Sequence, residues 1–93
     1  MLLRPHIPLR ATIGVHKQGF KYYIITTYFK DGKIEGKSVE TTVFPYKVTA
    51  IIREIISEEV LKGVRLSAIE IYNYSSLKIN DIIKLVKVHN HLK

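Results

Sequence analysis

Side chains that can bind phosphate are concentrated in the first half of the chain. Five lysines follow one another there at short intervals: Lys17, Lys21, Lys30, Lys33 and Lys37. An ammonium group that binds a nucleic-acid phosphate releases the counterions condensed around it, which favours binding. The lysines can form one basic face, or they can protect the edge of a sheet from pairing with another chain. We take Lys17, Lys21, Lys33 and Lys37 as the candidate nucleic-acid-binding residues.

Tyrosine is the second residue type that suits such a partner. The chain has six tyrosines: Tyr22, Tyr23, Tyr28, Tyr46, Tyr72 and Tyr74. Aromatic side chains on a sheet can stack unpaired bases while neighbouring lysines hold the phosphates. Tyrosine is also favoured in strands and at protein interfaces, so these residues by themselves fit either role.

Patterns for catalysis or metal binding are not readable in the sequence. Gly14 and Gly19 lack the spacing of a dinucleotide-binding loop, and the serines stand without a nucleophile-and-base motif. His89 and His91 flank Asn90, and on a helix two such positions face different ways, so they are not expected to chelate one ion. The absence of cysteine excludes disulfides and thiolate ligands. We therefore predict no catalytic residue, no metal and no cofactor.

The composition indicates one basic globular domain. Fifteen Lys and Arg against eight Asp and Glu give a net charge of +7 and a pI near 9.7, which favours a polyanionic partner such as DNA or RNA. An apolar content of 46% argues against disorder, and 93 residues suit a single domain over residues 1–93. Abundant Ile, Lys and Glu with one Met are also typical of thermophile proteins.

Targeting signals are not evident. No apolar run approaches the roughly 20 residues of a membrane span, and the first residues lack the apolar core of a signal peptide. We expect a cytoplasmic protein without a membrane partner.

The hydrophobic pattern predicts an α/β fold. The expected elements are an extended lead-in over residues 1–9, strands over 10–16, 20–30 and 33–44, a helix over 45–62, a strand over 65–74 and a second helix near the C-terminus. The first strand alternates apolar and polar residues with period two. Asp31-Gly32 predicts a hairpin turn, and Gly36 predicts a bulge or a sheet edge in the third strand.

Helix signals bound the rest of the chain. Pro45 suits the first turn of a helix, and Gly63 suits the position that follows its last residue. Ser75, Ser76 or Asn80 can cap a second helix, whose buried stripe is Ile79, Ile82, Ile83 and Val86. The three early strands should form an antiparallel meander, and the crossover helix should return the fourth strand parallel to the first.

Two stretches resemble the RNase H-like superfamily, and most nearly its RuvC-type Holliday-junction resolvases. Residues 12–16, Thr-Ile-Gly-Val-His, are similar to the first strand of that family, which ends in a catalytic Asp. Residues 66–72, Leu-Ser-Ala-Ile-Glu-Ile-Tyr, are similar to its fourth strand, in which a catalytic Glu follows an apolar triplet. The resemblance covers residues 10–90 and implies an RNase H-like fold, truncated and degenerate.

The resemblance also implies what became of the chemistry. The family hydrolyses phosphodiesters with two divalent metal ions held by clustered carboxylates. Glu70 matches one ligand position, whereas His16 stands where the first Asp belongs, and a neutral imidazole supplies no negative charge for Mg²⁺. Nothing after Asp81 is acidic, although the family carries its last ligands there. On an alternative alignment, to RNase H itself, Tyr74 and Lys47 replace acidic residues and no ligand remains. The resemblance therefore implies a vestigial site at His16 and Glu70.

Three hypotheses for function follow. The first is a non-catalytic nucleic-acid-binding domain derived from an RNase H-like nuclease. The second is a protein-interaction or assembly module that forms a homodimer through a sheet edge or the second helix. The third is a divergent nuclease that uses Mg²⁺ or Mn²⁺ and takes its missing carboxylates from a partner.

Overall fold

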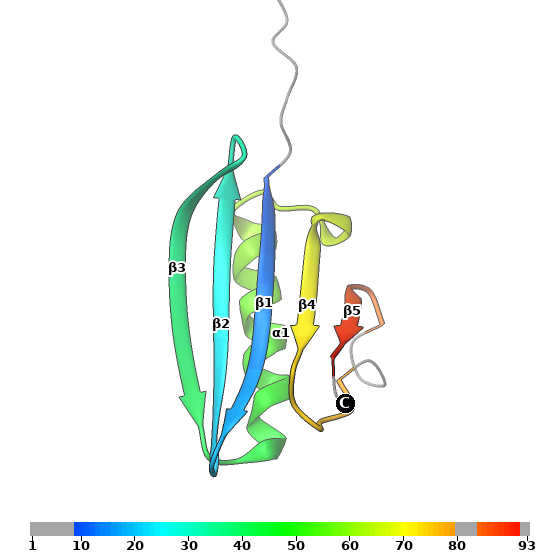
Figure 1. Cartoon of the computed structure of the whole chain (residues 1–93). Helices are drawn as coiled ribbons and strands as arrows, with labels where there is room; N and C mark the ends of the chain where they lie inside the picture. Colours follow the sequence, from blue (N-terminus) through cyan, green and yellow to red (C-terminus); the bar gives the residue numbers. More distant parts are fainter. Residues whose placement is uncertain (1–8, 80–83, 92–93) are drawn as a thin grey trace, which may run out of the picture.

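The computed structural model describes residues 9–79 and 84–91 of the chain. These residues form a five-stranded mixed sheet with α1 packed on one side of it (Figure 1). The elements are β1 (Arg10–Gln18), β2 (Lys21–Lys30), β3 (Lys33–Thr42), α1 (Pro45–Leu61), the 3₁₀ turn η1 (Leu66–Ala68), β4 (Ile69–Asn73) and β5 (Lys87–Asn90). Their order across the sheet is β3-β2-β1-β4-β5. The predicted lead-in over residues 1–9 lies outside the described residues, except for Leu9.

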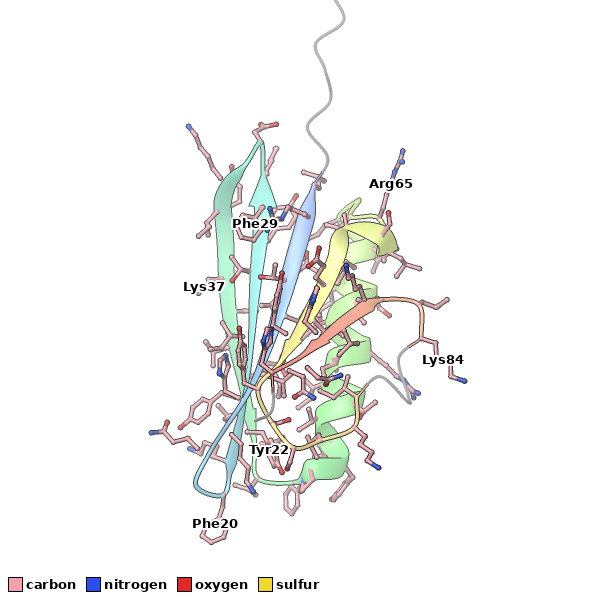
Figure 2. The ribbon with its side chains drawn as sticks, turned by 45° about the vertical axis from the view of Figure 1, so that its right-hand side comes forward. Phe20, Tyr22, Phe29, Lys37, Arg65 and Lys84 are labelled. Carbon is pink, nitrogen blue, oxygen red and sulfur yellow. The ribbon has the colours of Figure 1, made fainter. Side chains whose placement is uncertain are left out.

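The first three strands form the predicted antiparallel meander. The turn between β2 and β3 has positive φ at both Asp31 and Gly32, 53° and 76°, as a two-residue hairpin turn requires. The β1–β2 turn is carried by Gly19 at φ 62° and by Phe20, which points away from the sheet at its tip (Figure 2). The register of β3 against β2 shifts at Glu35, so the predicted bulge is confirmed, and β3 is an outer strand of the sheet.

The crossover through α1 also follows the prediction. Pro45 lies in the first turn of α1, where its missing N–H leaves no helical hydrogen bond unmade. Gly63, at φ 102°, ends the helix, and the Val64 N–H donates to the Glu59 carbonyl oxygen at 3.0 Å. β4 then lies parallel to β1, as predicted. Within the described part of the chain, no helix is long and apolar enough to cross a membrane.

The sheet has one covered side and one open side. Alternate residues of β1, β2 and β4 face α1 and join its apolar stripe in the core: Ala11, Ile13, Val15, Tyr22, Ile24, Val48, Ile52, Ile55, Ile69 and Ile71. Figure 1 shows α1 running behind β1, between β2 and β4 in this view. We call this the helix side. The opposite side, which no element covers among the described residues, we call the open face.

The predicted C-terminal helix is wrong for the part of the segment that the structure describes. Residues 74–79 and 84–86 contain no helix, and β5 follows them as a fifth strand parallel to β4; Asn80, Ile82 and Ile83 lie outside the described residues. The physical reason is visible at both ends. The Ser75 hydroxyl is bound to the Asn73 side chain at 2.6 Å, and the strand-forming Val86 and Val88 alternate with polar residues. The predicted fourth strand is also shorter, because η1 occupies residues 66–68.

Asn73 connects the two ends of this segment. Its side chain is buried, with 1% of the residue exposed, and makes four hydrogen bonds. The amide oxygen accepts from the Ser75 N–H at 3.0 Å and from the Ser75 hydroxyl at 2.6 Å. The amide nitrogen donates to the Leu77 carbonyl oxygen at 2.7 Å and to Asn90 Oδ1 at 3.0 Å. One side chain thus joins the end of β4, the chain that leaves it and the end of β5.

We expect Asn73→Ala to lower the free energy of unfolding by about 2–4 kcal/mol, because the Ser75 N–H and hydroxyl and the Leu77 carbonyl oxygen lose their bonds to the Asn73 side chain. Asn90→Ala is the control, since it removes one of the four bonds at an exposed residue and should cost about 1 kcal/mol or less. Urea unfolding followed by circular dichroism measures both. Equal values for the two variants would contradict the bridging role of Asn73.

Candidate functional site

Aromatic and imidazole rings gather on the open face where β1, β4 and β5 lie side by side. The His16 ring stacks on Tyr74 with centroids 4.7 Å apart and planes 12° apart, and Tyr74 stacks on His91 at 4.9 Å and 16°. Beside this row, Tyr72 stacks on His89 at 4.7 Å and 11°. We call these five side chains the ring row. Tyr72 and Tyr74 share the open face because alternate residues of a strand face the same side, and the same holds for His89 and His91.

The backbone pairing sets this alignment. The Tyr74 N–H donates to the Val15 carbonyl oxygen and the His91 N–H donates to the Asn73 carbonyl oxygen, each at 2.8 Å. Both residues therefore continue the strand pairing by one step and lie level with His16. The His16 ring bends back over Gly14, where a Cβ would lie 3.1 Å from His16 Nε2. Glycine at position 14 thus makes room for the ring.

Glu70 is held by two members of the ring row. The Tyr72 hydroxyl donates to Glu70 Oε2 at 2.8 Å, and His89 Nε2 lies 2.8 Å from the same oxygen. The hydrogen bond from Tyr72, followed by that of His89, lowers the pKa of Glu70 below its ordinary value. The same bond raises the pKa of Tyr72, since it favours the protonated phenol. The carboxylate is therefore ionised and already bound at neutral pH.

Cations surround the ring row. Arg10 lies on the open face, with its guanidinium carbon 4.4 Å from the centre of the Phe29 ring. Lys87 on β5 lies opposite Glu70 on β4 in the strand register. Lys21 and Lys37 lie on the open face, in β2 and β3. Of the other described acidic residues, Glu40 lies opposite the buried Ile24 and so faces the helix side, Glu35 lies at the bulge of β3, and the rest lie in α1 or in the Asp31 turn. Positive charge therefore dominates this face.

The four predicted lysines divide between the two sides of the sheet. Lys21 lies opposite Gln18 and Lys37 lies opposite Thr27, which places both on the open face; Lys37 is labelled in Figure 2. Lys17 lies opposite the buried Tyr22, with its ammonium 5.7 Å from that ring, and thus faces the helix side. Lys33 pairs with Lys30, also on the helix side.

The predicted vestigial pair, His16 and Glu70, lies on one face but not in one cluster. Glu70 is level with Thr12, so His16 is four residues further along β1. At about 3.3 Å per residue the separation along the strands is roughly 13 Å. The neighbour of His16 is Tyr74, and the neighbours of Glu70 are Tyr72 and His89. Among the described residues, no three His, Asp or Glu side chains are grouped so that they could hold a metal ion.

The sequence reasoning missed the part that β5 plays in the site. It places His89, His91 and Lys87 in or beside a helix, on which the two imidazoles would diverge. The signal that could have found them is the alternation from Val86 to His91, in which every second residue is polar and exposed or half-buried. Arg10 was also missed, because its value comes from its position over Phe29 on the neighbouring strand.

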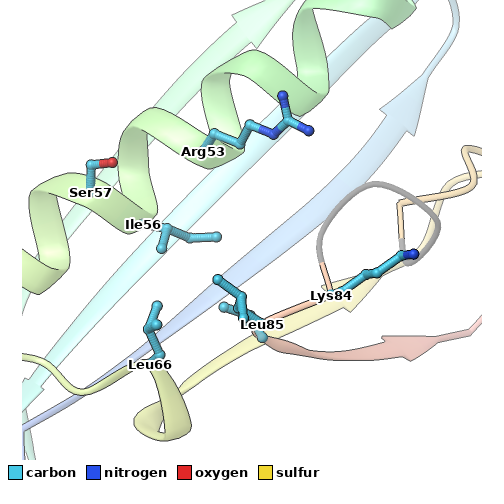
Figure 3. A pocket seen from close by; sticks show the side chains of 7 residues that line it. Arg53, Ile56, Ser57, Leu66, Lys84 and Leu85 are labelled. Carbon is cyan, nitrogen blue, oxygen red and sulfur yellow. The ribbon is translucent and has the colours of Figure 1, made fainter.

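Cavities lie on the helix side, away from the ring row. One, of about 380 Å³, is lined by Ile56 and Arg53 of α1, by Leu66 of η1 and by residues 84–86 (Figure 3). Another, of about 360 Å³, lies between α1 and the β2–β3 pair and includes the buried Glu59, whose Oε1 is 3.3 Å from the Lys62 ammonium. Neither contains a residue of the ring row.

Comparison with known proteins does not assign the chain to a family. No protein-family model, curated protein or solved structure matches it.

We expect Gly14→Ala to displace the His16 ring from Tyr74, because the added methyl group would lie 3.1 Å from His16 Nε2. The ring-current shift of the His16 protons in an NMR spectrum reports the stack directly. Gly36→Ala is the matched control: it also lies in a strand, and its added methyl would meet nothing within 4 Å. An unchanged His16 spectrum in Gly14→Ala would show that the ring does not depend on this glycine.

We expect Glu70→Gln to change the acid side of the stability profile. Because folding lowers the pKa of Glu70, its ionised form stabilises the native state above the unfolded-state pKa, about 4.3, and that contribution is lost as the pH falls through the lower folded-state value. The stability difference between wild type and Glu70→Gln should therefore be present at pH 6 and shrink below about pH 4.

Thermal melting across this pH range measures the Glu70 effect. Glu58→Gln removes an exposed carboxylate of α1 and controls for the change in net charge. A difference between wild type and Glu70→Gln that stays constant from pH 6 to pH 3 would contradict the assignment.

Proposed function

We propose that the protein is a non-catalytic nucleic-acid-binding domain whose ligand lies on the open face. The observation that carries the proposal is the ring row on the open face, surrounded by Arg10, Lys21, Lys37 and Lys87. Sheet surfaces of this composition combine π-faces for bases with cations for phosphates. Glu70, whose carboxylate lies among the rings, is already bound by Tyr72 and His89 and so repels a polyanion less than a free carboxylate would.

The proposal includes descent from an RNase H-like nuclease. Support comes from the antiparallel meander, the α1 crossover and the return of β4 parallel to β1, which the resemblance implied. The loss of the nuclease chemistry is part of the proposal. His16 supplies no carboxylate, and Glu70 is committed to Tyr72 and His89 rather than directed at His16.

Assembly with other copies is a second candidate function. β3 is a ten-residue outer strand whose Ile34 and Val39 side chains are 61% and 56% exposed. An outer strand of this kind can pair with a second copy, although its charges and the bulge at Glu35 oppose pairing. Light scattering over a range of protein concentrations distinguishes a stable dimer from a monomeric binder.

Charge removal on the two sides of the sheet tests nucleic-acid binding. We expect the double variant Lys21→Gln and Lys37→Gln to weaken binding and to reduce the slope of log K against log salt concentration by about 0.7–0.9 for each phosphate that the variant no longer neutralises. Fluorescence anisotropy of a labelled oligonucleotide at several salt concentrations measures both quantities.

The matched control is the double variant Lys17→Gln and Lys33→Gln. It removes the same charge from the helix side of the β1–β2–β3 meander and should leave the slope nearly unchanged. Equal losses of affinity in both double variants would assign binding to net charge alone. Affinity that does not respond to salt in the wild type would refute nucleic-acid binding by this face.

A further inference from the structure

We infer that the nucleic acid bound by the open face is single-stranded, with an unpaired base extending the ring row at the β5 edge. This inference rests on the proposed function and names the class of its ligand. Three features carry it: the orientation of the rings, the placement of the cations and the shape of the surface.

The rings stack on one another, so most of their faces are already covered. His16 and Tyr74, Tyr74 and His91, and Tyr72 and His89 lie within 5 Å of each other in nearly parallel planes. The outer faces of His89 and His91 are turned to the edge of the sheet, because β5 is its last strand. A base can stack there as the next member of the row, since every base offers a π-face.

The cations are placed for a backbone that crosses the strands. Lys87 lies on β5, opposite Glu70 of β4 and two residues before His89, at the end of the row where the base would stack. Arg10 covers Phe29 towards the other edge of the sheet, and its guanidinium plane can itself stack a base. Lys37 on β3 extends the positive charge beyond Arg10, and Lys21 adds a cation at the other end of β1, beside the β1–β2 turn. A strand that runs from β5 to β3 thus has Lys87 at its start and Lys37 at its end, with the rings and Arg10 between them.

A duplex fits this surface poorly. Its base faces are stacked inside the helix, and a protein reaches only the phosphates and the base edges in the grooves. The major groove admits an α-helix or a two-stranded ribbon, whereas this face belongs to a five-stranded sheet. A second copy of the chain also fits poorly, since two open faces would bring Arg10, Lys21, Lys37 and Lys87 of each copy together.

The test compares a labelled single strand of about 15 nucleotides with a blunt duplex of the same sequence. We expect the wild type to bind the single strand at least about tenfold more tightly. Tyr74→Leu and His91→Leu should each weaken single-strand binding by about fivefold or more while leaving the salt slope unchanged. His91→Leu removes a ring on which the base stacks, Tyr74→Leu removes the ring that supports it, and neither removes a lysine or an arginine. Tyr74→Phe keeps the ring and should bind like the wild type.

Tyr46→Leu is the matched control, since Tyr46 is an equally aromatic, 71% exposed side chain at the start of α1. Circular dichroism melting shows whether each variant is folded. If Tyr74→Leu does not fold, His91→Leu carries the test, because His91 is exposed. Equal affinity for both forms, or leucine variants that bind like the wild type while the open-face lysine variant weakens, would overturn the single-strand inference and leave the proposed function standing. Failure to bind either form at low salt would overturn both.

Discussion

The buried amide of Asn73 is the interaction on which the rest of the structure depends. Parallel strands such as β4 and β5 cannot be joined by a tight turn, so something must fix where the chain leaves one and ends the other. Asn73 does this with four hydrogen bonds to Ser75, Leu77 and Asn90. Buried polar groups that are fully bonded specify one arrangement, because any other leaves donors or acceptors without partners.

The alignment of the open face follows from that anchor. Tyr74 directly follows Asn73 at the end of β4, and His91 directly follows Asn90 at the end of β5. Each residue extends the backbone pairing of the sheet by one step. The ring row therefore stabilises the sheet through cross-strand contacts as well as offering a surface for a ligand. Replacing a ring alters both properties, which is why stability and binding have to be measured on the same variants.

Much of the fold could be predicted because its signals are local. The Asp31-Gly32 turn, the first-turn Pro45 and the helix-ending Gly63 each act through backbone conformation, and the structure confirms all three. The C-terminal segment could not be predicted in this way. Ile79 and Val86 are buried, as expected of them, but β5 has only four residues and depends on its pairing with β4. A short strand gains its stability from a distant partner, which a local pattern does not contain.

The features of the candidate site likewise divide into those that the sequence predicts and those that depend on tertiary contacts. By itself the sequence determined the basic character of the chain, the abundance of tyrosine and the meander that carries Lys21 and Lys37. Only the tertiary structure decided which side of the sheet each lysine faces. Lys33 and Lys37 are four residues apart, which places them on one face of a regular strand, but the bulge at Glu35 puts them on opposite sides. The tertiary structure also brought His89 and His91 against Tyr72 and Tyr74, because strand pairing joins residues that are far apart in the chain.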